Sequence, residues 1–253
     1  MKITWSWLPL FFLLPAALVL FGKQKTPSKD ARTGFAVVEL FTSEGCSSCP
    51  AADQLVEKIA AENGGKRVYI ASYHVDYWDR LGWKDRFSKK EYAAYQYAYA
   101  KQFKLNSVYT PQIVINGQLQ FVGSNGILLR SSINNNLNQP ETAQLTLQRA
   151  ESDPAVCKVQ YALEGGETSA ALLFVLLQKK AVVRIERGEN QGKTLSHTNI
   201  VRAVKSLTSG QLSGTLSIPV PADMRGEWEL LCYAKDPAGK ILTAQSIQAE
   251  PVK

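Results

Sequence analysis

FAVVELF at residues 35–41 and GCSSCP at residues 45–50 decide the fold, and only the turn residues TSE separate them. The first stretch is almost continuously apolar and contains two valines, which is typical of a strand buried on both faces. Apolar residues then recur at helical spacing from Ala52 to Ile59, so residues 46–61 are predicted to form a helix. Cys46 and Cys49 therefore lie where a buried strand passes into a helix.

Residues 35–139 have the sequence pattern of an α/β domain, and residues 140–253 have that of an all-β domain. Further predicted elements of the first part are a strand at 68–75, a helix that Ser88 and Glu91 would cap, a hairpin at 112–116 and 119–122 joined by Asn-Gly, and a helix at 125–137. The order is β-α-β-α-β-β-α. After Pro140, short Val-, Leu-, Ile- and Thr-rich runs alternate with glycines, which predicts an antiparallel β-sandwich.

Size and composition agree with two ordinary globular domains. The chain has 253 residues, of which 45% are hydrophobic and 20% charged. The net charge of +7 comes from scattered positions and short pairs such as Lys89-Lys90. Nucleic-acid binding requires a basic stripe with interleaved aromatic residues, so no nucleic-acid partner is expected.

The N-terminus indicates export. An uncharged, largely apolar stretch fills positions 3–22 between Lys2 and Lys23, and we interpret residues 1–22 as a signal peptide or a membrane anchor. Residues 23–34 are predicted to be a linker. The protein is thus expected to be periplasmic or secreted, or attached to the membrane by this segment. In an exported chain, disulfides among the four cysteines can persist.

The position of the CxxC predicts its chemistry. A helix N-terminus carries partial positive charge and unpaired N–H groups, which stabilise a thiolate. Cys46 is therefore the predicted nucleophile, and Cys49, one turn along the helix, can attack the resulting mixed disulfide. Pro50 falls in the first turn, where its missing N–H costs little.

The succession of a strand, a CxxC at a helix start, a second strand and helix, and an X-Pro bond before a hairpin resembles the thioredoxin-like superfamily. In that superfamily the proline is cis and faces the redox pair, and the matching residues are Thr110 and Pro111. The segments FTSEGCSSCP, HVDYWDRLGWKD, VYTPQIVINGQ and ERGENQGKTLSH also resemble an uncharacterised family of exported bacterial proteins. The resemblance implies a thioredoxin-like domain at residues 35–139 and a β-rich domain at residues 140–253, but no substrate.

The same resemblance draws attention to polar residues near the CxxC. Thioredoxin-like redox proteins often bury an acid in the strand before the CxxC, where it accepts the proton of the resolving thiol. Glu39 is the candidate for that role, unless it is a surface carboxylate at the edge of the strand. His74 and Asp76 end the second strand, and they either tune the thiols or form a structural pair. Trp78 is a candidate for the rim of a peptide site or for loop packing.

The remaining cysteines and the second histidine lie in the β-rich half. Cys157 and Cys232 fall in predicted strands, where they form either a structural disulfide or two buried free thiols. We expect His197 to be structural or exposed rather than a metal ligand.

These observations predict a thiol-disulfide oxidoreductase that acts on exported proteins and needs no bound cofactor. Its partners would be protein thiols or disulfides and a redox partner protein; whether it is an oxidase, a reductase or an isomerase is left open. One alternative is a copper- or zinc-binding protein that uses Cys46, Cys49 and His74. Another is a non-catalytic binding protein in which the CxxC is a permanent staple.

Overall fold

The structure is a computed structural model that describes Met1 and residues 34–153, 155–166, 168–208 and 210–252. The predicted signal or anchor segment and the linker lie almost entirely outside the described residues. Within the described part, no helix has both the length and the apolar character needed to cross a membrane. Contacts group residues Ala31–Lys253 into one compact unit.

Helices and strands alternate in the first part of this unit, and only strands follow. The helices are α1 (Cys49–Glu62), the 3-10 helix η1 (Asp76–Leu81), α2 (Lys90–Gln102) and α3 (Gly126–Leu137). The strands are β1 (Ala36–Thr42), β2 (Val68–His74), β3 (Gln112–Ile115), β4 (Leu119–Val122), β5 (Ala143–Ser152), β6 (Val156–Gly165), β7 (Ala171–Arg184), β8 (Thr194–Leu207), β9 (Ser213–Pro219), β10 (Gly226–Lys235) and β11 (Ile241–Val252).

Local sequence explains most of the first part. All seven residues of β1 are buried, and Pro50 lies in the first turn of α1. Asn116 and Gly117 both have positive φ in the β3–β4 turn, as a tight Asn-Gly hairpin requires. The predicted capping box of α2 does not form, because the Ser88 hydroxyl donates to Asp79 Oδ2 and to the Asp85 carbonyl instead.

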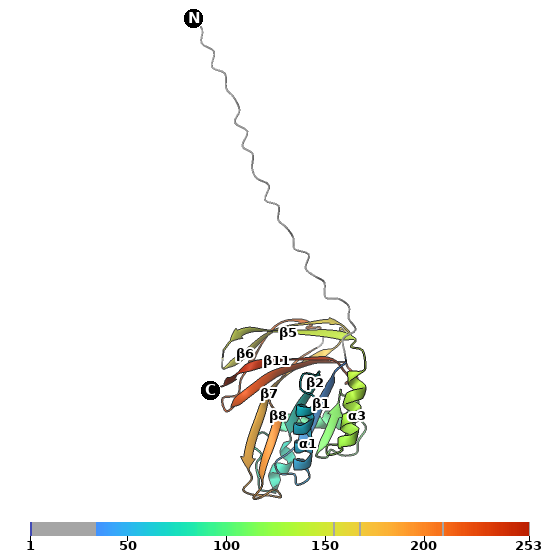
Figure 1. The fold of residues 1–253 in the computed structure, drawn as a ribbon, viewed down its shortest axis with the longest axis vertical. Helices are drawn as coiled ribbons and strands as arrows, with labels where there is room; N and C mark the ends of the chain where they lie inside the picture. Colours follow the sequence, from blue (N-terminus) through green and yellow to red (C-terminus); the bar gives the residue numbers. More distant parts are fainter. Residues whose placement is uncertain (2–33, 154, 167, 209, 253) are drawn as a thin grey trace. The chain divides into compact units, whose positions relative to one another are not determined.

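The strands form one large sheet and one small sheet. The large, eight-stranded sheet has the order β11-β10-β7-β8-β2-β1-β3-β4, and the small sheet has the order β5-β6-β9 (Figure 1). In the large sheet β2 lies parallel to both β1 and β8, and the other pairs are antiparallel. Strands from both ends of the chain therefore share one mixed sheet.

This arrangement shows that the predicted fold class, a thioredoxin-like domain followed by a β-sandwich, is wrong. Two of the short runs after Pro140, at residues 170–178 and 182–186, are predicted by their sequence to be separate sandwich strands, but nearly all of both lies in the single long strand β7. Its partner β8 pairs with β2, where Ser72 lies opposite Ile200 and donates its hydroxyl to the carbonyl of Thr198 at 2.9 Å. The physical reason is that the alternation of apolar and polar residues determines which face of a strand is buried. It does not determine which other strand it pairs with.

Four hydrophobic clusters of the described residues pack around the strands, and the smallest of them joins Phe87 to β7 and β8. Helices α1 and α3 pack on one face of β1 and β3, through residues such as Val38 and Val56. Helix α2 covers the opposite face, where Val37 and Phe41 of β1 meet Tyr92 and Tyr99. The small sheet packs on β7 and β10. The start of α1 thus lies at the edge where β1, β2 and β8 run side by side.

Candidate functional site

Cys46 and Cys49 form a disulfide at the start of α1, with their Cα atoms 5.4 Å apart. Cys46 is 1% exposed and Cys49 is fully buried. The sequence predicted the pair and its place at the helix start, but it did not predict that Cys46 would be covered.

The connection between β7 and β8, residues 185–193, is hydrogen-bonded to the CxxC turn, and we call it the cover loop. The Asn190 side-chain amide donates to the carbonyl oxygens of Glu44 and Cys46, at 2.8 and 2.9 Å. The backbone N–H of Ser47 donates to a carboxylate oxygen of Glu189 at 3.1 Å. A carboxylate is thus bound at the N-terminus of α1, where the positive end of the helix dipole favours an anion.

The cover loop also rests on the segment that follows η1. A Cβ added at Gly188, which has a φ of 78°, would lie 3.3 Å from the Cβ of Trp83. The indole N–H of Trp83 in turn donates to Glu44 Oε2 at 2.7 Å. Lys193 donates to Asn190 Oδ1 at 2.9 Å and orients that side chain. These contacts hold the loop against the CxxC turn and against the segment that follows η1.

Pro111 packs beside α1, and its peptide bond with Thr110 is cis. A Cβ added at Gly123 would lie 3.0 Å from the Cβ of Pro111 and 3.2 Å from that of Ala52, which is in the first turns of α1. The structure therefore places Pro111 next to the helix that carries the disulfide, and it brings Thr110 with it.

Trp78 lies between the CxxC turn and Thr110. Its indole N–H donates to Thr110 Oγ1 at 2.8 Å, and its Cβ would be 3.1 Å from a Cβ added at Gly45. Trp78 is half-buried, which fits a place at the rim of the site. Asp76, two residues earlier, is half-buried in η1 and does not pair with His74.

Glu39 is buried on the opposite face of β1 from α1. Successive side chains of a strand point to opposite faces, so Glu39 lies on the same face as Val37 and Phe41, which contact α2. The alternate residues of β1 contact α1. Its carboxylate accepts hydrogen bonds from Tyr95 and Tyr233 at 2.8 Å each, and from Tyr99. The structure thus surrounds Glu39 with tyrosines and does not bring it to the disulfide.

His74 pairs with Asp85, which the sequence did not single out. The two side chains are fully buried, with 2.6 Å between His74 Nδ1 and Asp85 Oδ2. Asp85 Oδ2 also accepts the N–H of Glu44 at 2.9 Å, and Oδ1 accepts the N–H of Phe87. Burial disfavours the Asp85 carboxylate, but His74 and these N–H groups outweigh it and lower the pKa of Asp85.

His197 lies on the α1 face of the sheet between two buried carboxylates. Its Nε2 is 3.5 Å from Glu44 Oε1, and its Nδ1 is 3.7 Å from Asp53 Oδ2. Its ring packs edge-on against that of His74, with centroids 4.8 Å apart. Burial alone would lower the pKa of His197, but Asp53 and Glu44 outweigh it and raise this pKa to about 10. We call Glu44, Asp53 and His197 the acid–histidine cluster.

The acid–histidine cluster is buried without being fully hydrogen-bonded. Glu44 Oε1, Asp53 Oδ2, both ring nitrogens of His197 and His74 Nε2 have no hydrogen-bond partner within the described residues. Such atoms are rare in folded proteins and call for an explanation. No set of three or more His, Cys, Asp or Glu side chains in the described ranges is arranged to hold a metal ion.

Sequence reasoning missed several residues of this site. Asp53 had a usable signal, because it lies in the buried stripe of α1 together with Cys49 and Val56. Asn190 was not singled out and His197 was expected to be structural or exposed, because the place of both residues depends on β8 joining β2. The structure leaves Cys157 and Cys232 as free, buried thiols away from this site, and burial raises the pKa of each.

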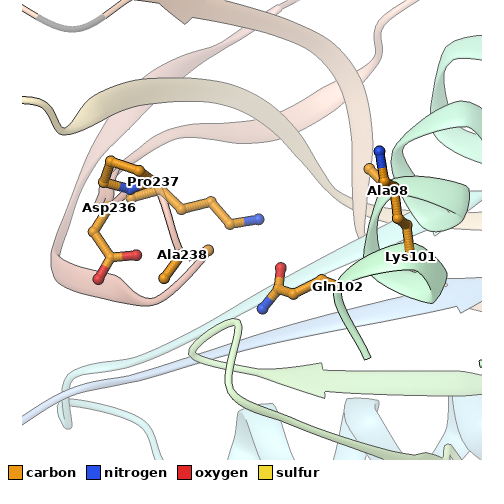
Figure 2. Close-up of a pocket in the computed structure, with 8 residues that line it drawn as sticks. Ala98, Lys101, Gln102, Asp236, Pro237 and Ala238 are labelled. Atoms are coloured by element: carbon orange, nitrogen blue, oxygen red, sulfur yellow. The ribbon is translucent and has the colours of Figure 1, made fainter. Parts of the chain in front are cut away.

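A hollow elsewhere on the molecule contains none of the predicted site residues. It has a cavity volume of about 490 Å³ and lies between the end of α2 and the turn from β10 to β11. Figure 2 shows Lys101 and Gln102 of α2 on one side and the turn residues Asp236, Pro237 and Ala238 on the other.

The fold and site define a mostly β protein, built on a large mixed sheet with a few helices, that has a buried CxxC disulfide at a helix start. A family model described as "Protein of unknown function (DUF1223)" matches residues 37–232, and the chain belongs to this family. A crystal structure of an Agrobacterium tumefaciens structural-genomics target is similar to it, with 26% sequence identity and a TM-score of 0.66. The match covers 86% of this chain and 96% of that one. No curated protein matches the sequence.

Proposed function

We propose that the protein exchanges thiols and disulfides with exported proteins through Cys46 and Cys49, without a bound cofactor. The observation that carries this proposal is the disulfide at the start of α1, where the helix N-terminus stabilises a thiolate on the outer cysteine. The packing of cis-Pro111 and Trp78 around this turn supports a site for an extended partner segment. Export itself is proposed from the N-terminal sequence.

The exchange reaction needs two attacks on sulfur. The reduced Cys46 thiolate attacks a partner disulfide, which gives a Cys46–partner bond and releases one partner thiolate. Cys49 then attacks Cys46 Sγ and releases the second partner thiolate. The partner disulfide gains two electrons, and the CxxC pair loses them. An oxidising protein would run the same steps in reverse.

Partner access requires the cover loop to move. Asn190 and Glu189 hold it on the CxxC turn through three hydrogen bonds, two from the Asn190 amide and one to the Glu189 carboxylate. Loops held by a few polar contacts open at low free-energy cost compared with global unfolding. We propose that a partner polypeptide replaces these contacts when it binds.

Trapping the mixed disulfide tests this proposal. In reduced full-length Cys49→Ser protein, Cys46 should form a stable mixed disulfide with a peptide disulfide, whereas reduced Cys46→Ser should form far less through the buried Cys49. Both adducts are quantified by mass spectrometry. Equal and slow reaction of the two variants would contradict the proposal.

A second candidate function has one observation in its favour. Cys46 is only 1% exposed, as expected for a permanent staple in a non-catalytic binding protein. In that case mild reductants would leave the disulfide intact, and the reduced Cys46 would react no faster than an ordinary thiol. The trapping experiment therefore separates the two functions.

A further inference from the structure

Lys235 is a half-buried lysine on the face of the large sheet that α2 covers. It follows Leu231 and Tyr233 at alternate positions of β10, and both of those residues belong to the core beneath α2. Lysines are seldom withdrawn from water into such a place without a carboxylate partner. The groups around its ammonium therefore indicate its role.

The ammonium of Lys235 lies against aromatic rings and not against an acid. Its Nζ is 4.0 Å from the centre of the Tyr99 ring and 4.9 Å from that of Tyr95, and it donates to the Tyr95 hydroxyl at 3.2 Å. Within the described residues, no Asp or Glu forms an ion pair with it. Burial lowers the pKa of Lys235, which Glu39 and Asp236 counter only in part. An ammonium has three donors, so two of them have no acceptor in the described part of the chain.

Two hollows meet at this side chain. One is the hollow of Figure 2, which we call the turn hollow, between the end of α2 and the turn from β10 to β11. The other, which we call the tyrosine hollow, has a cavity volume of about 490 Å³. This volume falls in the range of small-molecule sites, about 300–1,000 Å³. The walls of the tyrosine hollow include Tyr73, Tyr92, Tyr95, Leu173, Val204 and Lys235.

The tyrosine hollow combines an apolar wall with one charged end. Leu173 of β7 and Val204 of β8 are only half-buried, so they offer apolar surface to a ligand. Glu91 at the rim lies 3.6 Å from Lys89 Nζ, so its charge has a partner of its own. A mostly apolar hollow with a few polar groups that fix orientation is typical of a ligand site. Its complement is a molecule with an apolar body and a negative end.

We propose that the tyrosine hollow binds an amphipathic monoanion, with its carboxylate at Lys235 and its apolar chain against Leu173 and Val204. The carboxylate accepts hydrogen bonds from the unused ammonium donors, and the chain leaves water. A single negative charge fits best, because Asp236 in the adjoining turn hollow repels a second one. The site is independent of the proposed exchange reaction, since α1 packs on the opposite face of the sheet.

Calorimetric titration of the oxidised full-length protein with decanoate tests this inference. We expect one saturable site per chain, with a dissociation constant below about 1 mM. Decyltrimethylammonium, which has the same chain and a positive head, should bind at least about tenfold more weakly, because it cannot use the ammonium donors. Acetate, which has the head without the chain, should also bind at least about tenfold more weakly.

Two variants locate the binding in the tyrosine hollow. Lys235→Gln should weaken decanoate binding at least about tenfold by removing the charge. Val204→Trp should weaken it by a similar factor by filling the hollow, and it carries the test if Lys235→Gln folds poorly. Lys205→Gln is the matched control, because Lys205 is exposed and its side chain points to the opposite face of β8 from Val204. It should bind decanoate as the wild type does.

Three results would overturn the inference. The first is no saturable binding of decanoate by the wild type below about 1 mM. The second is binding of wild-type strength in both Lys235→Gln and Val204→Trp, because the ligand would then lie elsewhere on the chain. The third is equal affinity for decyltrimethylammonium, which would show apolar adsorption without recognition of charge. None of these results bears on Cys46 or Cys49, so the proposed function stands or falls separately.

Discussion

Two buried acids on opposite faces of the sheet have contrasting surroundings. Glu39 accepts hydrogen bonds from three tyrosine hydroxyls, and burial raises the pKa of each of these tyrosines, so they remain donors. Lys235 adds a positive charge, with its Nζ 3.2 Å from the Tyr95 hydroxyl. Among the described residues, no side-chain oxygen of Glu39, Tyr95, Tyr99 or Tyr233 is buried without a hydrogen-bond partner.

The acid–histidine cluster on the α1 face is different. It contains two carboxylates and a protonated histidine at 3.5 and 3.7 Å, and each of the three side chains has at least one atom without a partner. Fully satisfied buried networks rigidify a fold, whereas a buried polar atom without a partner calls for an explanation. The acids on the two faces are similarly buried, and they differ in whether their oxygens have hydrogen-bond partners.

The largest expected effect is on stability, at Glu39. Glu39→Ala leaves three buried tyrosine hydroxyls without their acceptor and Lys235 without a nearby negative charge, and it should lower the free energy of unfolding by about 4 kcal/mol. Urea denaturation measures this, with Glu57→Ala as the control for loss of a half-exposed carboxylate. Glu39→Gln keeps the shape of the side chain and should leave the rates of both thiol-disulfide exchange steps unchanged. A slower second step, the attack by Cys49, would show that Glu39 takes part in the exchange.

The next effect is a pH dependence of stability at His197. Its pKa of about 10 in the folded protein exceeds the ordinary 6.5, so its ion pairs stabilise the fold fully below about pH 6.5 and are lost as the pH rises through 10. The difference in unfolding free energy between wild type and His197→Gln should shrink by on the order of 3 kcal/mol over that range. Urea denaturation at several pH values measures it, and a constant difference would show that His197 is not protonated in the fold.

A smaller effect is expected at the cover loop. Asn190→Ala removes the two hydrogen bonds to the Glu44 and Cys46 carbonyls and should favour the open loop by about 1–2 kcal/mol. Dithiothreitol should then reduce the Cys46–Cys49 disulfide about tenfold faster. Gln191→Ala, which alters the neighbouring position, is the control. Unchanged reduction kinetics would mean that the cover loop does not limit access.

The smallest effect concerns Glu189, which is exposed. Its carboxylate at the N-terminus of α1 opposes a second negative charge on Cys46. Glu189→Gln should lower the pKa of the Cys46 thiol by about half a unit, and added salt should reduce the difference. Thiolate absorbance against pH measures it in the reduced Cys49→Ser background.

Local patterns predicted part of this molecule. The CxxC at a strand–helix junction, the hairpin after Pro111 and the buried β1 depend on residues close in sequence, and the structure has them. The helical periodicity of α1 could also have identified Asp53 as a buried residue. Its charge interrupts the apolar stripe of α1, and that interruption is the signal.

The rest depended on pairing between distant segments. Ser72 and Thr198 are 126 residues apart, yet their contact joins the two halves of the large sheet. That pairing places His197 next to α1 and the cover loop next to Cys46. No local pattern encodes which strand edges meet.

The pKa of the Cys46 thiol tests the central claim most directly. It is measured by ultraviolet thiolate absorbance in the reduced Cys49→Ser protein, with the other cysteines buried. A thiolate-stabilising helix N-terminus predicts a value at least about one unit below the ordinary 8.5. A value of about 8.5 or higher would contradict a nucleophilic Cys46 and leave the disulfide as a structural staple.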